Sequence, residues 1–402
     1  MSRDDALLAG LRAQARTVQP RTVALRRALH RRPEVGLDLP ITRDAVLASL
    51  ADLPLQVHLG RAVTSVVAVL EGSRPGPTVL LRGDMDALPL HEDTQLAFAS
   101  EVAGAMHACG HDTHVAMLAS AARVLADHRD EFAGRVLLMF QPGEEGFHGA
   151  RYMIEEGLLD EHGRPDAAYA LHISSTVPTG ELQTRAGPVM AAADVLRVTV
   201  TGRGGHASAP HDALDPVPAA AAMVGALQVA LTRRIDAHHP AVLTIAHITA
   251  GTTNNVIPET AFLEGTLRTL SGPVRARLLE EIDRVCLHTA LAHGCTAEVE
   301  IEPGYPVTVN DPDAAAAVRG LAVDMLGRKK VVEMVAPIMG AEDFSYVLTE
   351  VPGALAFLGG CPPGLDPATA PPNHSNRVVF DEAAMVDGVA LYAGLALRAL
   401  RC

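Results

Sequence analysis

A short stretch of the chain is rich in residue types that commonly bind metal ions. Residues 107–114 read His-Ala-Cys-Gly-His-Asp-Thr-His, so three histidines, one cysteine and one aspartate lie within eight positions. Alternation of His, Cys and His suits an extended segment whose side chains converge on a metal, and mixed sulfur and nitrogen donors favour zinc or a similar late transition metal. Two alternatives stay open here: a helix N-terminus with scattered histidines, and a Cys–His nucleophile pair.

Five further positions carry side chains suited to catalysis, and none is decisive alone. Glu144 and Glu145 follow an apolar run; adjacent acids repel unless one binds a metal ion and the other acts as a base, and otherwise they form a solvated turn. His172 follows an apolar run and suits a buried core histidine equally well. His374 lies in a polar, proline-rich loop. His206 follows a glycine-rich turn, for which a plain surface turn is an equal alternative.

Several common catalytic motifs are absent from the sequence. It contains no HExxH helix, no P-loop and no GxSxG elbow, which excludes the commonest zinc proteases, NTPases and α/β-hydrolases. The two lysines, Lys329 and Lys330, are adjacent in an expected surface loop and offer no desolvated amine for covalent catalysis.

The elements around these clusters alternate between strands and helices. The run at 135–140 is continuously apolar, as in a strand buried on both faces of a parallel sheet. The alternation indicates an α/β domain with a mostly parallel central sheet. We expect helices at 4–32, 42–50 and 111–126, strands at 65–70, 78–81 and 135–140, and a turn at 72–77.

The pattern changes near Gly187. From there the expected order is strand, helix, two strands, helix and strand over just over a hundred residues, which is a ferredoxin-like order. We therefore expect a smaller α+β domain, 187–303, inserted into a larger α/β domain formed by 1–186 and 304–402. Its elements are expected at 196–200, 216–231, 241–248, 260–270, 273–292 and 297–301.

The composition of the chain indicates which classes of binding partner are disfavoured. The chain has 402 residues, of which 48% are hydrophobic, enough for two domains with buried cores. Its formal net charge of −14 disfavours binding to nucleic acid or to an anionic membrane. Four arginines of the first helix form a local basic cluster that we expect to be solvated: Arg26, Arg27, Arg31 and Arg32.

Cysteine usage indicates a compartment. Five widely spaced cysteines do not form a disulfide framework and suggest a reducing environment. No stretch is long and apolar enough for a membrane span, and no secretory signal is visible, so we expect a cytoplasmic protein. The cysteines are Cys109, Cys286, Cys295, Cys361 and Cys402.

Taken together, the motifs resemble those of the dinuclear-metal amidohydrolases related to aminoacylase, especially the branch with hippurate hydrolase, N-acyl-amino-acid deacetylases and auxin-conjugate hydrolases. The resemblance covers almost the whole chain. It implies a larger catalytic domain and a smaller lid and dimerisation domain, hence a homodimer or higher oligomer. Beyond the clusters above, it includes residues 25–34, 83–89, 255–258 and 339–345.

The resemblance also implies a ligand set for two divalent metal ions, in which the Cys109 sulfur bridges them. Zinc and manganese are favoured, and cobalt and nickel also fit such donors. In related dinuclear peptidases the position of Asp84 carries a ligating histidine, so this sequence departs from the wider superfamily there. The implied ligands are Cys109, His111, Glu145, His172 and His374.

Further roles follow from the same resemblance. Glu144 would be the general base, and Asp86 would orient the metal-binding histidine segment. His206 and Asn255 would contact the substrate carbonyl oxygen, with His206 reaching it from a partner subunit. Arg268 would bind the carboxylate of the substrate, because the guanidinium fork suits a planar carboxylate.

The implied reaction is hydrolysis of the amide bond of N-acyl amino acids, N-acetyl, N-benzoyl or similar, by a metal-activated water with a glutamate base. Three alternatives remain: a dipeptidase or carboxypeptidase with the same site, a non-catalytic metal- or ligand-binding relative, and a Cys109 thiol hydrolase insensitive to chelators. The non-catalytic alternative is disfavoured because Glu144 and all five implied ligands are present.

Overall fold

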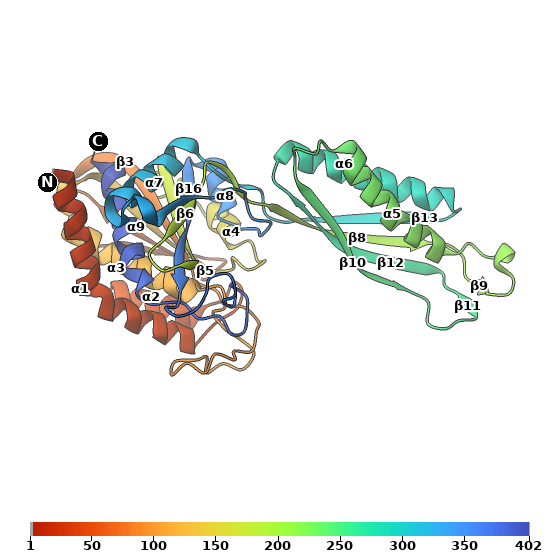
Figure 1. Ribbon diagram of the computed structural model, residues 1–402, viewed down its shortest axis with the longest axis horizontal. Coiled ribbons are helices and arrows are strands. Elements are labelled where there is room, and N and C mark those ends of the chain that lie inside the picture. The colour runs from red at the N-terminus through yellow and green to blue at the C-terminus, as the bar shows by residue number, and fades with distance from the viewer. Residues whose placement is uncertain (1–2, 402) are drawn as a thin grey trace. The chain divides into compact units, whose positions relative to one another are not determined.

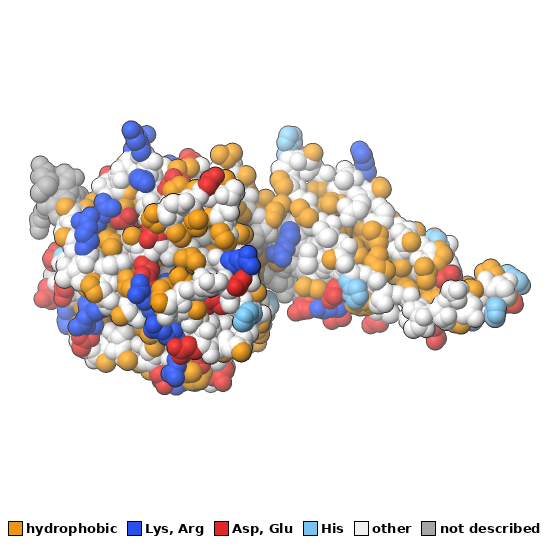
Figure 2. Space-filling view, turned by 60° about the horizontal axis from the view of Figure 1, so that its bottom comes forward, with side chains coloured by type: hydrophobic (Ala, Val, Ile, Leu, Met, Phe, Trp, Pro, Cys, Tyr) orange, Lys and Arg blue, Asp and Glu red, His pale blue; other side chains and the backbone are white. Residues whose placement is uncertain are grey.

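A computed structural model describes residues 3–401 of the chain, which form two compact units (Figure 1). The larger unit comprises the chain up to Val189, Val309–Ala336 and the chain from Asp343. The smaller unit comprises Met190–Thr308 and Pro337–Glu342. On the face shown in Figure 2, acidic and basic side chains intermingle, with hydrophobic side chains scattered among them.

The larger unit is built on an eight-stranded sheet in the order β1-β2-β4-β3-β5-β16-β6-β15. Its centre is parallel, since β4, β3, β5 and β16 pair in parallel, while β1, β2 and the β16–β6 pair are antiparallel. This confirms the predicted α/β class with a mostly parallel sheet. The strands are β1 (Gln56–Leu59), β2 (Val66–Glu71), β3 (Arg74–Asp84), β4 (Ala133–Gln141), β5 (Ala167–Pro178), β6 (Leu182–Thr184), β15 (Val331–Glu333) and β16 (Gly353–Cys361).

Three long helices pack on one another: α1 (Arg3–Arg31), α3 (His111–Asp127) and α9 (Ala384–Leu400). Both α3 and α9 contact β3, and β16 is buried along its whole length. These helices therefore seal a core in which the central strands are apolar on both faces. The other helices of this unit are α2 (Pro40–Leu50), α4 (Gly149–Glu155), α7 (Pro312–Leu326) and α8 (Ser345–Glu350).

Two local expectations are wrong. The expected turn at 72–77 is largely part of β3, which begins at Arg74 and pairs with Ala133 before an irregularity. A Cβ on Gly76 would lie 2.7 Å from the Gly134 nitrogen, so a glycine lets the two backbones pass closely. The expectation that four arginines of the first helix are solvated is wrong for Arg26, which is buried, whereas Arg27 and Arg32 are exposed and Arg31 is partly exposed.

The smaller unit is a four-stranded antiparallel sheet in the order β10-β12-β8-β13, with two helices packed on it. Its chain order of strand, helix, two strands, helix and strand confirms the predicted ferredoxin-like arrangement. A separate two-stranded sheet pairs β9 with β11. The elements are β8 (Ala192–Thr201), β9 (Gly205–His206), α5 (Pro216–Arg234), β10 (Ala241–Ala250), β11 (Val256–Ile257), β12 (Thr260–Thr269), α6 (Gly272–Ala292) and β13 (Thr296–Pro303).

Short elements complete the fold. Among residues 3–401, no helix has the length and apolar character needed to cross a lipid bilayer. The remaining strands are β7 (Gly187–Met190) and β14 (Thr308–Asn310), and 3₁₀ turns lie at Arg129–Glu131, Pro210–Asp212 and Arg328–Lys330.

Candidate metal centre

Metal-binding side chains gather where neighbouring strands of the larger unit end. Asp84 closes β3 and Asp86 follows it, whereas Glu144 and Glu145 follow the adjacent parallel strand β4. Because the carboxyl ends of parallel strands lie at one edge of a sheet, these acids come together there. His172 lies within β5, the next strand.

The Cys109–His111 segment reaches this edge through a sharp turn at Gly110. The turn has φ 86°, in the left-handed region that favours glycine. A Cβ at this position would lie 2.4 Å from Cγ2 of Ile173, so only glycine fits beside β5. Helix α3 begins at the next residue, His111.

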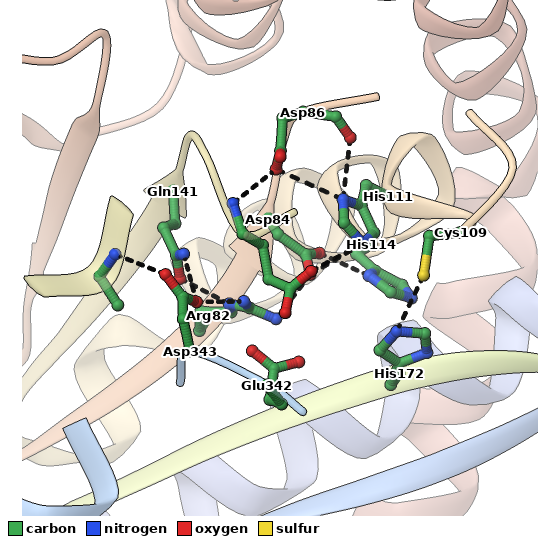
Figure 3. A network of polar contacts seen from close by, with 12 residues as sticks. Arg82, Asp84, Asp86, Cys109, His111, His114, Gln141, His172, Glu342 and Asp343 are labelled. Carbon is green, nitrogen blue, oxygen red and sulfur yellow. Dashed lines mark hydrogen bonds and ion pairs between the residues drawn. The ribbon is translucent and has the colours of Figure 1, made fainter. Parts of the chain in front are cut away.

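A first group of donors is formed by Cys109, His111 and His172, whose candidate ligand atoms all lie within 4.8 Å of one another (Figure 3). The Cys109 Sγ atom is 3.4 Å from Nε2 of His172. The His111 Nδ1 atom donates to the carbonyl oxygen of Asp86, and His172 Nδ1 donates to that of Ile173, each over 2.8 Å. Both rings therefore keep the Nε2 lone pair for a metal ion.

A second group is formed by Cys109, Glu145 and His374. The His374 Nε2 atom lies 3.3 Å from Cys109 Sγ and 3.2 Å from Glu145 Oε1. The Cys109 sulfur thus belongs to both groups, as a bridging thiolate requires. Sulfur, imidazole and carboxylate donors at these separations suit two ions of a late transition metal.

The pKa shifts of two candidate ligands are consistent with a site that binds a cation. Burial, followed by the nearby Glu145 carboxylate, raises the pKa of the Cys109 thiol. Hydrogen bonds to Cys109 and Glu145 raise the pKa of His374 to about 10. These two groups would have to release their protons in order to hold a divalent cation. The buried His111 Nε2 atom makes no hydrogen bond, which also suits a ligand atom.

The Asp86 carboxylate accepts hydrogen bonds from the backbone of the acidic pair, Glu144 and Glu145. The Glu144 N–H donates to Asp86 Oδ1 and the Glu145 N–H donates to Asp86 Oδ2, each over 3.0 Å. Glu144 is buried, with Oε2 4.0 Å from His111 Nε2. The pair is therefore held in place, with Glu144 buried and Glu145 partly buried, and does not form the solvated turn of the alternative interpretation.

Sequence reasoning missed a buried network behind the ligands (Figure 3). Arg82 Nη1 donates to Asp84 Oδ2 over 2.6 Å, and Arg82 Nη2 donates to Asp343 Oδ1 over 3.2 Å. The Asp84 Oδ1 atom accepts from His114 Nδ1, whose Nε2 accepts the Ile173 N–H next to His172. Burial opposes ionisation of Asp84, but Arg82 and the histidines hold its pKa well below the usual range. A charged residue in an apolar strand was the available signal for Arg82.

Asn373 was also missed, although it precedes His374. Its amide nitrogen donates to the carbonyl oxygens of Cys109 and Ile173, and its oxygen accepts the Ser175 N–H. The His374 N–H donates to the Ala108 carbonyl oxygen. This loop is therefore hydrogen-bonded to the Cys109 and His172 segments, two of those that carry candidate ligands.

The smaller unit carries the remaining candidate residues. His206 is exposed in β9, and the Asn255 carbonyl oxygen accepts the Ala207 N–H, so His206 and Asn255 lie on neighbouring segments. Arg268 lies in β12, which belongs to the other sheet of this unit.

Comparison with known proteins decides the family. Residues 80–398 match the family described as peptidase family M20/M25/M40. The chain belongs to the M20 peptidase family. This confirms the resemblance to the metal-dependent amidohydrolases.

Relatives of the M20 family include the thermostable carboxypeptidase 1 of Saccharolobus solfataricus, which is 38% identical over 98% of both chains. The N-acetyl-L-cysteine deacetylase of Bacillus subtilis is 37% identical over 85% of this chain and 81% of its own. The crystal structure of the Bacillus subtilis YXEP protein, a dinuclear metal binding peptidase from the M20 family, has a TM-score of 0.83 and 31% identity, covering 96% and 99% of the two chains. This chain is a metal-dependent amide hydrolase.

Proposed function

We propose that this enzyme hydrolyses the amide bond of N-acyl amino acids, with N-acetyl and N-benzoyl amino acids as candidate substrates. The observation that carries the proposal is the single sulfur of Cys109, shared by two donor groups beside the buried carboxylate of Glu144. The relative named N-acetyl-L-cysteine deacetylase supports the substrate class.

Two donor groups that share the Cys109 sulfur support the ligand assignment. Cys109, His111 and His172 would hold one divalent ion, and Cys109, Glu145 and His374 the second. Zinc or manganese would fill the sites, and cobalt or nickel also suit the donors. Bound ions would polarise the amide carbonyl and lower the pKa of a water molecule from ~16 towards ~7.

Glu144 acts as the general base. Its carboxylate takes a proton from the attacking water and returns it to the leaving amine. Asp86 holds the backbone of Glu144 and Glu145, which keeps the two carboxylates in separate roles. Glu145 is directed to His374 and therefore serves as a ligand.

His206 and Asn255 of the smaller unit would donate to the carbonyl oxygen of the substrate. The Ser208 N–H donates to His206 Nδ1 over 3.1 Å, so the neutral imidazole carries its proton on Nε2. An Nε2–H donor suits an oxyanion that develops during attack. Arg268 would bind the substrate carboxylate. We propose that this unit is the lid and the dimerisation domain, and that His206 serves the partner subunit of a homodimer or higher oligomer.

We also propose a cytoplasmic location. Within residues 3–401 all four cysteines are buried and free of disulfides: Cys109, Cys286, Cys295 and Cys361. A reducing compartment preserves such thiols. Cys402 lies outside the described residues.

A second candidate function is a dipeptidase or carboxypeptidase with the same site, favoured by the relative named thermostable carboxypeptidase 1. A hydrolysis screen with metal-reconstituted protein separates the two. We expect higher kcat/KM for N-acetyl or N-benzoyl amino acids than for dipeptides. The reverse order would favour the peptidase, and full activity after removal of metal by a chelator would favour a Cys109 thiol hydrolase.

A further inference from the structure

An arginine and a histidine of α1 are buried although they touch none of the proposed ligands. The side chains of Arg26 and His30 are each only 1% exposed. Arg26 Nε and His30 Nδ1 both donate to Oδ2 of Asp112, each over 2.8 Å. One carboxylate oxygen of α3 thus receives two hydrogen bonds from α1. We call these three residues the Asp112 clamp.

The position of Asp112 makes the clamp relevant to the metal centre. Asp112 directly follows His111 and is fully buried in the first turn of α3. The ring of His111 is fixed by the Asp86 carbonyl oxygen. The clamp fixes the backbone one residue further along, so the ligand segment is held from both sides.

The clamp is itself anchored to two other segments of the larger unit. Arg26 Nη1 donates to Oε1 of Glu382 over 3.1 Å. His30 Nε2 lies 3.3 Å from Oε1 of Glu92, whose other oxygen accepts the Ser100 N–H. Because Arg26 and His30 each have a second partner on another segment, these two donors to Asp112 have little freedom to move.

Stability alone does not explain such a cluster. Burying an ion pair costs desolvation energy that its attraction often only balances, so apolar residues of similar size would serve packing as well. The two helices already share an apolar core that includes Leu29 of α1 and Val115 and Ala119 of α3. What the buried charges add is a fixed direction for the start of α3.

We propose that Arg26 and His30 are positioning residues for the metal centre, which act through Asp112 on the Cys109–His111 segment. The inference rests on the proposed ligand set and deepens it. Partners one step removed from the ligands commonly change metal affinity by 10–100-fold when they are lost.

Arg27 provides a matched control. It neighbours Arg26 on α1, pairs with the same Glu382 carboxylate at 2.6 Å, and stacks on the same Phe98 ring, at 4.8 Å compared with 4.6 Å for Arg26. Its side chain is 44% exposed and both of its hydrogen bonds go to Glu382. The two arginines therefore share Glu382 and Phe98, and they differ in burial and in the contact with Asp112.

The test is the zinc affinity of the full chain, measured by competition with a chromophoric chelator, with folding checked by circular dichroism. We expect Arg26→Leu to weaken zinc binding about 10–100-fold and Arg27→Leu to keep affinity close to that of the wild type. A folded Arg26→Leu protein with wild-type affinity would overturn the proposal.

A second pair of variants decides the matter if Arg26→Leu does not fold. His30→Gln keeps a side-chain donor for Asp112, whereas His30→Leu removes it. We expect the Gln variant to bind zinc more tightly than the Leu variant, and equal affinities would overturn the clamp. Because no substrate is used, failure to hydrolyse N-acyl amino acids leaves this result intact. A wild-type chain that binds neither zinc nor manganese, cobalt or nickel refutes the ligand set and the clamp together.

Discussion

The turn at Gly110 offers a quantitative test of how the ligand segment is built. Gly110→Ala would place a methyl group at φ 86°, where a non-glycine residue costs about 1–2 kcal/mol. That methyl carbon would lie 2.4 Å from Cγ2 of Ile173 and 3.1 Å from Cε2 of Phe380. Ile173 is β-branched and buried in β5, so it cannot rotate away, and overpacking of this kind costs a further ~1–3 kcal/mol. We expect a total loss of about 2–5 kcal/mol.

Gly104 separates the two contributions. It has φ 76°, and a Cβ there would meet no atom within 4 Å. Gly104→Ala should therefore show the backbone cost alone, about 1–2 kcal/mol. Both glycines lie in the larger unit, so the same unfolding transition reports on both.

The assay is urea denaturation of the metal-free protein, followed by far-ultraviolet circular dichroism. Equal losses of stability for the two variants would refute the steric argument, because they would show that β5 yields to the added methyl. We also expect zinc affinity to fall only in Gly110→Ala, since only that change moves Cys109 relative to His111.

Three further predictions concern the proposed roles and pH dependence. Glu144→Gln should keep its metal while kcat falls about 10²–10⁴-fold, whereas Glu145→Gln should lose metal; full metal content in both would contradict the assignment of base and ligand. His206→Ala should lower kcat on the order of 100-fold at unchanged metal content, and unchanged kinetics would exclude its role. Although burial opposes it, hydrogen bonds lower the pKa of Glu92 to about 2. The ionised Glu92 therefore stabilises the fold above about pH 4.5, and this stabilisation is lost as the pH falls towards 2. In urea denaturation, the free energy of unfolding should fall less between pH 6 and pH 3 for Glu92→Gln than for the wild type.

The fold was largely predictable because most elements carry local signals. The apolar run at 135–140 became β4 (Ala133–Gln141), and the helix expected at 111–126 became α3 (His111–Asp127). The buried position of Arg26 was not predictable, because charges on a helix look alike whether they face water or a partner. Its partner Asp112 lies 86 positions away.

Some residues of the candidate site were also predictable from the sequence, and others were not. The density of donors in residues 107–114 is visible in the sequence, and it includes both Cys109 and His111. His172 and His374 carry no signal alone, and the fold brings them to the same sulfur from segments that are far apart in the chain. Arg82 and Asp343 are 261 positions apart, so the sequence alone does not predict that they form a pair.

The order of the strands has a consequence for biosynthesis. In the larger unit β16 pairs directly with β5, although the whole smaller unit lies between them in the chain. The Tyr392 hydroxyl, in α9, donates to the Arg82 carbonyl oxygen and accepts the Leu171 N–H. As the chain leaves the ribosome, most of the smaller unit, Met190–Thr308, is synthesised as one segment and can fold early. The larger sheet is completed only when its last strand and helix have been synthesised, so Cys109 is present in the nascent chain long before His374, which lies beside its sulfur in the folded protein.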